Sequence, residues 1–247
     1  MLRHVSGDLY QIGESVAGHD GIHEAVRVYV LLNDGCPLIF DSGSHIHSGE
    51  IMSDLRQLLG DVPAAYVFLT HTELPHTGNL NVILKEWPEA KLVVSSGILP
   101  HVELPWWVRE DQVSYGYAGT DEVYGGRRIS FSDGILKDQP GTHWMFDRKT
   151  GTLFSADAFG YLFPKSADEA FDDELEDGIA PDWIKAYHES AFRFLPLAQG
   201  HKVADDIAKV FTVRDVRIIA PTHGNAIRGN IPDFTEKVIT ALKEICQ

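Results

Sequence analysis

A cluster of metal-binding residue types directly follows one apolar run of this 247-residue chain. The run Ala65–Leu69 leads into His71, Glu73 and His76, which form an H-x-E-x-x-H pattern. A buried strand that ends in such a cluster can deliver two imidazoles and a carboxylate to one point in space, as a metal site requires. We therefore expect metal ligation at the end of this strand.

The overall charge argues against several classes of partner. Lys and Arg number 21 against 36 Asp and Glu, which gives a formal net charge of −15. Such a surface repels phosphate backbones and anionic lipid, so we expect neither nucleic acid nor a membrane as partner. Two cysteines, Cys36 and Cys246, are too few for a disulfide framework and suit a reducing compartment.

We expect residues 1–247 to form a single domain and the protein to be cytoplasmic. Met1–Tyr10 lacks the apolar stretch of a signal peptide, and no later run approaches the roughly 18 apolar residues of a membrane span. No Ser/Gly-rich or charged linker divides the sequence.

Short β-branched runs and longer amphipathic stretches predict a mixed α/β fold with helices covering the sheets. The predicted strands are Val26–Leu32, Pro37–Phe40, Ala65–Leu69, Lys91–Val94 and Arg128–Phe131, and Asn33-Asp34-Gly35 predicts a hairpin turn between the first two. The predicted helices are Glu50–Leu59, Asn79–Trp87, Asp182–Phe194, Lys202–Phe211 and Asp233–Ile245.

Further ligand types stand at the ends of other strand-like runs. His143 lies in Thr142–Phe146, Asp157 ends a strand within Thr152–Gly160, and His223 follows Val216–Ala220. If these ends meet at one edge of a sheet, they assemble a candidate site large enough for two metal ions. The predicted ligand set is His71, Glu73, His76, His143, Asp157 and His223.

These motifs, with His143-Trp144, Leu153–Gly160 and Pro221-Thr222-His223-Gly224 followed by Arg228, resemble the diiron domain of flavodiiron proteins in order and rough spacing. That domain belongs to the metallo-β-lactamase superfamily, which also contains standalone oxygen-binding diiron proteins. The resemblance covers nearly the whole chain. It implies a four-layer αβ/βα metallo-β-lactamase-like sandwich with the site at the edge where two sheets meet.

The same resemblance implies a role for each ligand. His71, Glu73 and His143 would hold one iron, His76 and His223 the other, and Asp157 would bridge them. Two departures stand out. Pro75 occupies the place of an aspartate ligand, so we expect the second iron to be held weakly. The segment between His143 and Asp157 is shorter than in the family, so we expect a more open pocket.

Two classes of function are compatible with this ligand set. Zinc hydrolases of the superfamily carry H-x-H-x-D-H, whereas Glu73 and Pro75 replace two of those residues here, which favours iron and dioxygen chemistry. The first hypothesis is a non-haem iron protein that binds or reduces dioxygen or nitric oxide, or acts as a gas sensor. The alternative is a metal-dependent hydrolase, or a degenerate member that binds a small ligand.

The resemblance also bears on partners. The chain shows no Gly-rich dinucleotide turn and no flavodoxin-like segment, so we expect no tightly bound flavin. We expect a separate flavoprotein or rubredoxin-like protein to donate the electrons. We also expect a homodimer.

Several other residues have simpler interpretations. Ile39-Phe40-Asp41-Ser42-Gly43 resembles the early Asp-Thr-Gly turn of the superfamily, which implies that Asp41 supports the site from outside the ligand set; otherwise Asp41 only forms a turn. Surface positions are expected for His19, His23, His45 and His47, although any of them could replace the missing aspartate. We treat the acidic stretch Asp168–Asp177 as a solvated loop. Trp106, Trp107, Tyr115, Tyr117, Phe159 and Tyr161 are core candidates that could instead line a gas-accessible cavity.

Overall fold

The computed structural model describes residues 1–18 and 21–246, so the expectation for His19 lies outside the described residues. Its largest sheet has seven strands in the order β1-β2-β5-β6-β7-β8-β9. Their bounds are β1 Arg3–Ser6, β2 Leu9–Ile12, β5 Val28–Leu31, β6 Leu38–Phe40, β7 Tyr66–Phe68, β8 Lys91–Val94 and β9 Val113–Tyr115. From β6 onward the neighbouring strands are parallel, so β6, β7 and β8 end at the same edge.

The predicted hairpin between β5 and β6 is confirmed by their antiparallel pairing. Asn33, Asp34 and Gly35 all have positive φ, at 46°, 48° and 86°. Asn, Asp and Gly are the residues that adopt this left-handed conformation most readily, which explains why the turn forms here.

A second sheet has five strands in the order β10-β11-β12-β13-β15. They span Asp121–Tyr124, Arg127–Asp133, His143–Asp147, Thr152–Phe154 and Ile218–Ala220. A small third sheet joins β14 (Leu162–Pro164), β4 (Ile22–Ala25) and β3 (Ser15–Ala17). The sequence patterns did not predict β3, β4 or β14, whose short strands carry little apolar alternation.

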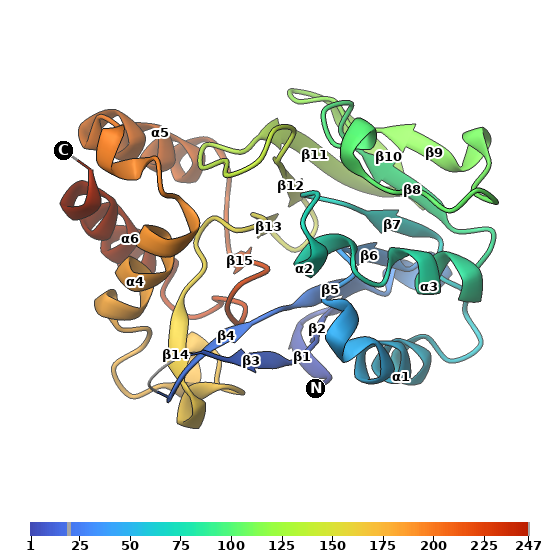
Figure 1. The fold of residues 1–247 in the computed structure, drawn as a ribbon, viewed down its shortest axis with the longest axis horizontal. Helices are drawn as coiled ribbons and strands as arrows, with labels where there is room; N and C mark the ends of the chain where they lie inside the picture. The colour runs from blue at the N-terminus through green and yellow to red at the C-terminus, as the bar shows by residue number, and fades with distance from the viewer. Residues whose placement is uncertain (19–20, 247) are drawn as a thin grey trace.

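All five predicted helices are present, with ends shifted by a few residues. The helices are α1 (Ser48–Leu59), α2 (Leu74–Thr77), α3 (Leu80–Glu86), α4 (Pro181–Ala191), α5 (Gly200–Val213) and α6 (Ile231–Ile245). Figure 1 shows α4, α5 and α6 on one outer side of the molecule and α1 and α3 on the other. No helix in the described ranges is both long and apolar enough to cross a membrane.

Strand alternation divides the core into layers. On β5, Val28 and Val30 pack with the helices α1 and α3, whereas Tyr29 and Leu31 face the second sheet. Between the two sheets the rings of Phe40 and Phe154 stack with their centroids 3.6 Å apart. A third cluster fills the space between the second sheet and α4, α5 and α6. This arrangement is the four-layer αβ/βα sandwich that the resemblance implied.

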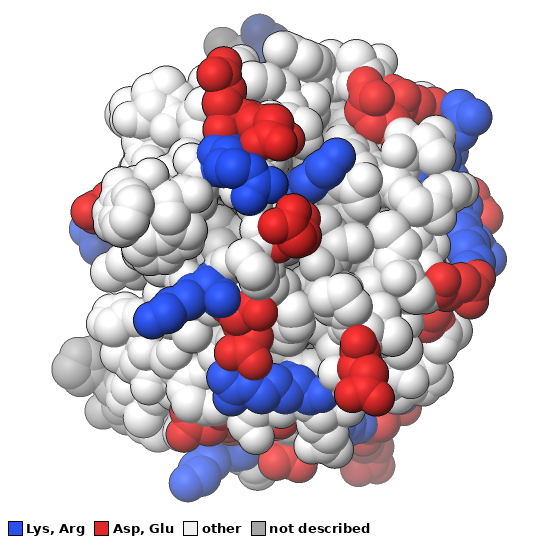
Figure 2. Space-filling model, turned by 90° about the vertical axis from the view of Figure 1, so that its right-hand side faces the viewer, with Lys and Arg blue, Asp and Glu red and all other residues white. Residues whose placement is uncertain are grey.

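The acidic stretch is not only a solvated loop, which corrects that expectation. Both carboxylate oxygens of Asp172 accept backbone N–H groups, including that of Gly229 at 3.0 Å. The guanidinium of Arg228 contacts Asp173 and Glu174. These contacts hold the segment that follows β15. On the face shown in Figure 2, basic and acidic side chains lie next to one another rather than in separate patches.

Candidate metal centre

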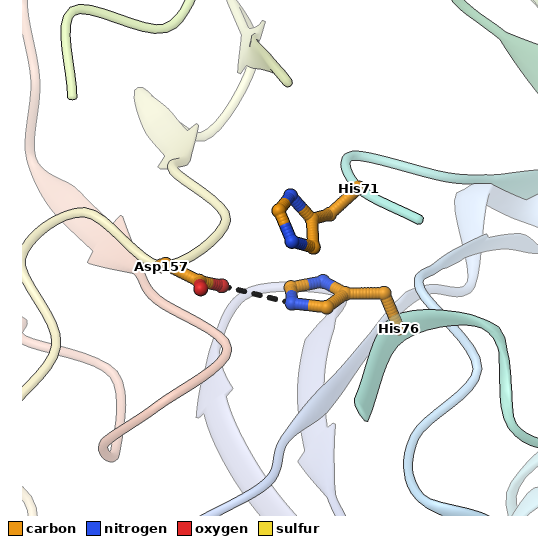
Figure 3. Close-up of side chains that lie close together, drawn as sticks. All are labelled: His71, His76 and Asp157. Carbon is orange, nitrogen blue, oxygen red and sulfur yellow. Dashed lines mark ion pairs between the residues drawn. The ribbon is translucent and has the colours of Figure 1, made fainter. Parts of the chain in front are cut away.

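Three chain segments bring ligand types to the edge where the two large sheets meet. His71 and Glu73 follow β7, and His76 lies in the short helix α2. Pro75 stands in the first turn of α2, where the missing N–H of proline costs no helical hydrogen bond. Asp157 follows β13. Figure 3 shows His71, His76 and Asp157 pointing toward one another from these separate segments.

His223 follows β15 in a turn that only glycine can complete. The next residue, Gly224, has a φ of 134°, and a Cβ there would lie 2.6 Å from the ring of Tyr161. The side chains of His223 and Asp157 are each about 6% exposed. Both residues therefore sit in a nearly buried position fixed by the backbone around them.

Two imidazoles converge on one oxygen of Asp157. Nε2 of His76 lies 2.8 Å from Oδ1 of Asp157, and Nε2 of His223 lies 3.6 Å from the same oxygen. Asp157 is thus the common neighbour of His76 and His223, and a ligand role for these three residues stays a prediction.

The other nitrogen of each of these histidines is held by a carboxylate. Nδ1 of His76 lies 2.8 Å from Oδ2 of Asp41, and Nδ1 of His223 lies 2.6 Å from Oε1 of Glu24. A carboxylate that accepts the Nδ1 proton leaves the Nε2 lone pair free to bind a metal. Asp41 therefore supports the site from outside the ligand set, as expected from its turn. Glu24, on β4, was not predicted.

His71 is oriented in the same way by a neutral partner. The hydroxyl of Thr142 donates its proton to the carbonyl of Gln139, so its oxygen accepts the Nδ1 proton of His71 at 2.8 Å. The Nε2 lone pair of His71 is therefore also directed inward, which is the form that a metal ligand needs.

Asp138 is a candidate ligand that the sequence analysis missed. Its Oδ2 lies 3.2 Å from Nε2 of His71. One group of atoms within 4.8 Å of one another comes from His71, Glu73, Asp138 and Asp157, and a second comes from His71, His76 and Asp157. The sequence did carry one signal for Asp138. The segment from His143 to Asp157 is shorter than in the family, and a ligand at Asp138 instead of His143 lengthens that segment.

His143 is not brought to this cluster, which corrects its assignment as an iron ligand. Its Nε2–H donates to the carbonyl of Leu69 at 3.1 Å, and its ring lies against Phe131. His143 opens β12, and strand alternation places it on the same face as Met145, between the two sheets. Burial lowers the pKa of His143 to about 4, although the Leu69 carbonyl opposes this shift, so the ring is neutral.

The buried charges favour a cation between the ligands. Burial alone would lower the pKa of His76, but Asp41 and Asp157 raise it to about 10. Burial alone would raise the pKa of Asp157, but His223 and His76 hold it well below its usual range. Without a metal, His76 therefore keeps a second proton between the two carboxylates at neutral pH, and a bound metal ion would replace that positive charge.

Unpartnered polar atoms point to the same conclusion. Within residues 1–18 and 21–246, five buried atoms of the cluster make no hydrogen bond of ordinary geometry: Nε2 of His71, Nε2 of His76, Oδ1 of Asp138, Oδ1 of Asp157 and Nδ1 of His223. Of these, Nε2 of His76 still lies within ion-pair distance of Asp157, and Nδ1 of His223 within ion-pair distance of Glu24. Buried polar atoms without partners are rare unless a ligand satisfies them. The residues therefore fit a metal ion.

A cavity of about 300 Å³ adjoins these ligands. Its lining includes Glu24, Glu73, Pro75, Asp138, Asp157 and Tyr187. The ring of Tyr187 stacks on His223, with centroids 5.5 Å apart. The proposed lining aromatics are elsewhere: Trp106, Trp107, Tyr115 and Tyr117 are exposed, and Phe159 and Tyr161 lie in the core beneath α4, α5 and α6.

No side chain replaces the missing aspartate at Pro75 among the described residues that form the two groups. His23, His45 and His47 belong to neither group; His45 is exposed as expected, whereas His23 and His47 are half-buried. His223 also lies outside both groups, so the group that contains His76 has fewer donors than the group of His71, Glu73, Asp138 and Asp157.

Comparison with known proteins gives consistent matches across this site. A family model described as ODP family beta lactamase matches residues 25–224. The nitric oxide reductase of Moorella thermoacetica is 23% identical over 216 residues, covering 87% of this chain and 52% of that protein. The coenzyme F420H(2) oxidase of Methanocaldococcus jannaschii is 25% identical over 159 residues, covering 62% of this chain and 37% of that protein.

Solved structures share the fold at lower sequence identity. The flavodiiron protein from Giardia intestinalis superposes with a TM-score of 0.80 at 18% identity, covering 99% of this chain and 59% of that one. Rubredoxin oxygen:oxidoreductase from Desulfovibrio gigas gives a TM-score of 0.74 at 19% identity, with 99% and 61% covered. The chain spans about half or less of the length of the two relatives matched by sequence.

Proposed function

The chain belongs to the ODP family of beta-lactamase-like domains, and from this premise we propose that it is a non-haem iron protein that binds or reduces dioxygen or nitric oxide. Relatives named nitric oxide reductase and rubredoxin oxygen:oxidoreductase support this choice of substrates. The observation that carries the proposal is the convergence of two carboxylate-supported imidazoles on Oδ1 of Asp157.

The proposed ligands form two positions that share Asp157. His71, Glu73 and Asp138 hold one metal ion, and His76 and His223 hold the other. Asp138 therefore takes the ligand role that the sequence analysis had assigned to His143. Because Pro75 supplies no donor, the position at His76 and His223 is the weaker one and keeps open sites for a small ligand.

Bound iron supplies the open coordination positions and the electrons for a diatomic gas. The protein side chains fix the ligands and control protons. Asp41, Glu24 and Thr142 hold the Nδ1 protons of His76, His223 and His71, so each ring keeps one orientation and one tautomer. Little rearrangement is then needed when a ligand binds.

Tyr187 lines the cavity and can donate its phenolic proton in a hydrogen bond. Burial, followed by the negative charge of Asp157, raises the pKa of Tyr187 well above its ordinary value. The phenol therefore keeps its proton at neutral pH. Since Tyr187 lines the cavity and stacks on His223, we propose that its hydroxyl donates a hydrogen bond to the gas or its reduced product.

In this proposal a separate redox protein supplies the electrons that reduce the iron. A flavoprotein or a rubredoxin-like donor is the class that fits, because the name of the Desulfovibrio gigas relative includes rubredoxin. We propose that residues 1–247 act as one domain that carries iron, without a tightly bound flavin.

Stopped-flow mixing tests this function. Protein is loaded with iron and reduced anaerobically, then mixed with dioxygen or with nitric oxide, while phosphodiester, lactone, thioester and β-lactam substrates are run in parallel. We expect a metal-dependent spectral response to at least one gas. Metal-dependent hydrolysis without any response to either gas would instead favour the hydrolase.

A further inference from the structure

The two proposed metal positions differ in the chemical type of their donors. One position is surrounded by three carboxylates, Glu73, Asp138 and Asp157, and by one imidazole, His71. The other position lies between the imidazole of His76 and the shared carboxylate of Asp157, and Nε2 of a second imidazole, His223, lies 3.6 Å from that carboxylate. We refer to these as the carboxylate position and the imidazole position.

We propose that these positions select different metals: the carboxylate position accepts Mn²⁺ as well as Fe²⁺, whereas the imidazole position takes Fe²⁺ and rejects Mn²⁺. This inference rests on the proposed function, because it assumes that the cluster binds metal. It goes beyond that function because it assigns a different metal preference to each half of the centre.

The preference follows from donor chemistry. Carboxylate oxygens suit Mn²⁺, whereas imidazole suits iron, and two imidazoles with one carboxylate and open positions are typical of non-haem Fe²⁺ sites. Affinity for a given set of donors is lower for Mn²⁺ than for Fe²⁺. Mn²⁺ can therefore compete only where anionic oxygens dominate. Asp138 adds an anionic oxygen at the carboxylate position, whereas Pro75 supplies none at the imidazole position.

The rigidity of the imidazole position preserves this difference. His76 and His223 are buried, and Asp41 and Glu24 fix their Nδ1 atoms at 2.8 and 2.6 Å. Neither ring can turn away to make room for water ligands without breaking these contacts. Glu73, in contrast, is exposed, and its Oε1 accepts a hydrogen bond from Gln139 at 3.0 Å. The carboxylate position can therefore adjust to the metal it receives.

A crystal of the apo-protein soaked anaerobically in equal concentrations of Mn²⁺ and Fe²⁺ tests the proposal. Anomalous differences collected on both sides of the manganese and iron absorption edges identify the metal at each position. We expect the manganese signal at the carboxylate position alone and iron at the imidazole position. In Asp138→His, which adds an imidazole there, most of the manganese signal should be lost. Asp133→Asn, a change at an exposed carboxylate nearby, should keep the wild-type pattern.

A titration in solution gives an independent readout. With Mn²⁺ alone, electron paramagnetic resonance should count about one bound ion per chain. Asp138→Ala should abolish that binding, while His223→Ala should leave it intact, and circular dichroism should show that both variants are folded. Manganese at both positions, or at neither while iron binds, would overturn the proposal. Failure of folded protein to bind either metal would overturn the proposed function itself.

Discussion

Oδ2 of Asp138, in the loop between β11 and β12, lies 3.2 Å from Nε2 of His71. This contact changes the balance of charge in the site. With Glu73 and Asp157 it brings the carboxylates to three, where the sequence assignment had two. The additional carboxylate lies beside His71.

Removing the carboxylate of Asp138 should reduce metal content. In Asp138→Asn we expect a loss of affinity larger than the roughly 10- to 100-fold typical of residues that only support a ligand. Elemental analysis after dialysis against limiting metal measures this effect. Asp133→Asn is the matched control, because its carboxylate is 73% exposed and contacts only Lys137 in the described residues. Equal metal content in the two variants would contradict a ligand role for Asp138.

Glu24 should matter for metal affinity although it is not a proposed ligand. Glu24→Gln removes the charge that holds Nδ1 of His223, so we expect a roughly 10- to 100-fold weaker binding at the imidazole position. Competition with a chelator measures the change. Glu50→Gln, in the exposed first turn of α1, should have no effect. Unchanged affinity in Glu24→Gln would mean that the carboxylate does not orient His223.

Pro75→Asp should raise metal content toward two ions per chain by adding an anionic donor beside His76. Pro75→Ala separates this effect from the loss of proline itself, since it supplies no donor and should leave occupancy as it is. Isothermal titration of the apo-proteins with Fe²⁺ gives both stoichiometry and affinity. If wild-type protein already binds two ions with equal affinity, the inference from Pro75 is wrong.

Acid should destabilise the fold through His188. Burial lowers the pKa of His188 from 6.5 to about 4, and its Nδ1–H donates to the carbonyl of Ile184. The unfolded chain therefore takes up this proton near pH 6.5 and the folded chain only near pH 4. Stability should fall between these values, by about 3 kcal/mol at most from this residue.

Urea unfolding at pH 7 and pH 4.5 measures that dependence. His188→Gln cannot titrate and should lose less stability on acidification than wild-type protein does. His201→Gln, at an exposed position on α5, should behave as wild type. The assignment fails if His188→Gln and wild-type protein lose the same stability.

Local patterns predicted the framework of the site because the ligands follow strands. The strand before His71 and the one before His223 are apolar runs, and the parallel strands β13 and β15 end at the same edge of the second sheet, which brings Asp157 and His223 together. The likeness of Ile39–Gly43 to the superfamily's Asp-Thr-Gly turn predicted the supporting carboxylate of Asp41. These features depend only on residues close in the sequence.

The residues that were missed depend on contacts between distant segments. Asp138 lies in the loop between β11 and β12, where no periodic pattern fixes the direction of a side chain. Glu24 reaches His223 only because β4 belongs to a small sheet that the sequence did not reveal. His143 was misassigned because a histidine at a strand end resembles a ligand, while strand alternation turns it between the sheets.

The iron content of anaerobically loaded protein tests the central claim most directly. Wild-type protein and Asp157→Ala are loaded with Fe²⁺, freed of unbound metal by gel filtration, and analysed for iron per chain, with circular dichroism to establish that both are folded. Because both proposed positions share Asp157, wild-type protein should retain at least one iron per chain and Asp157→Ala should retain almost none. Folded wild-type protein without iron, or equal iron in the two proteins, would contradict a metal centre at this site.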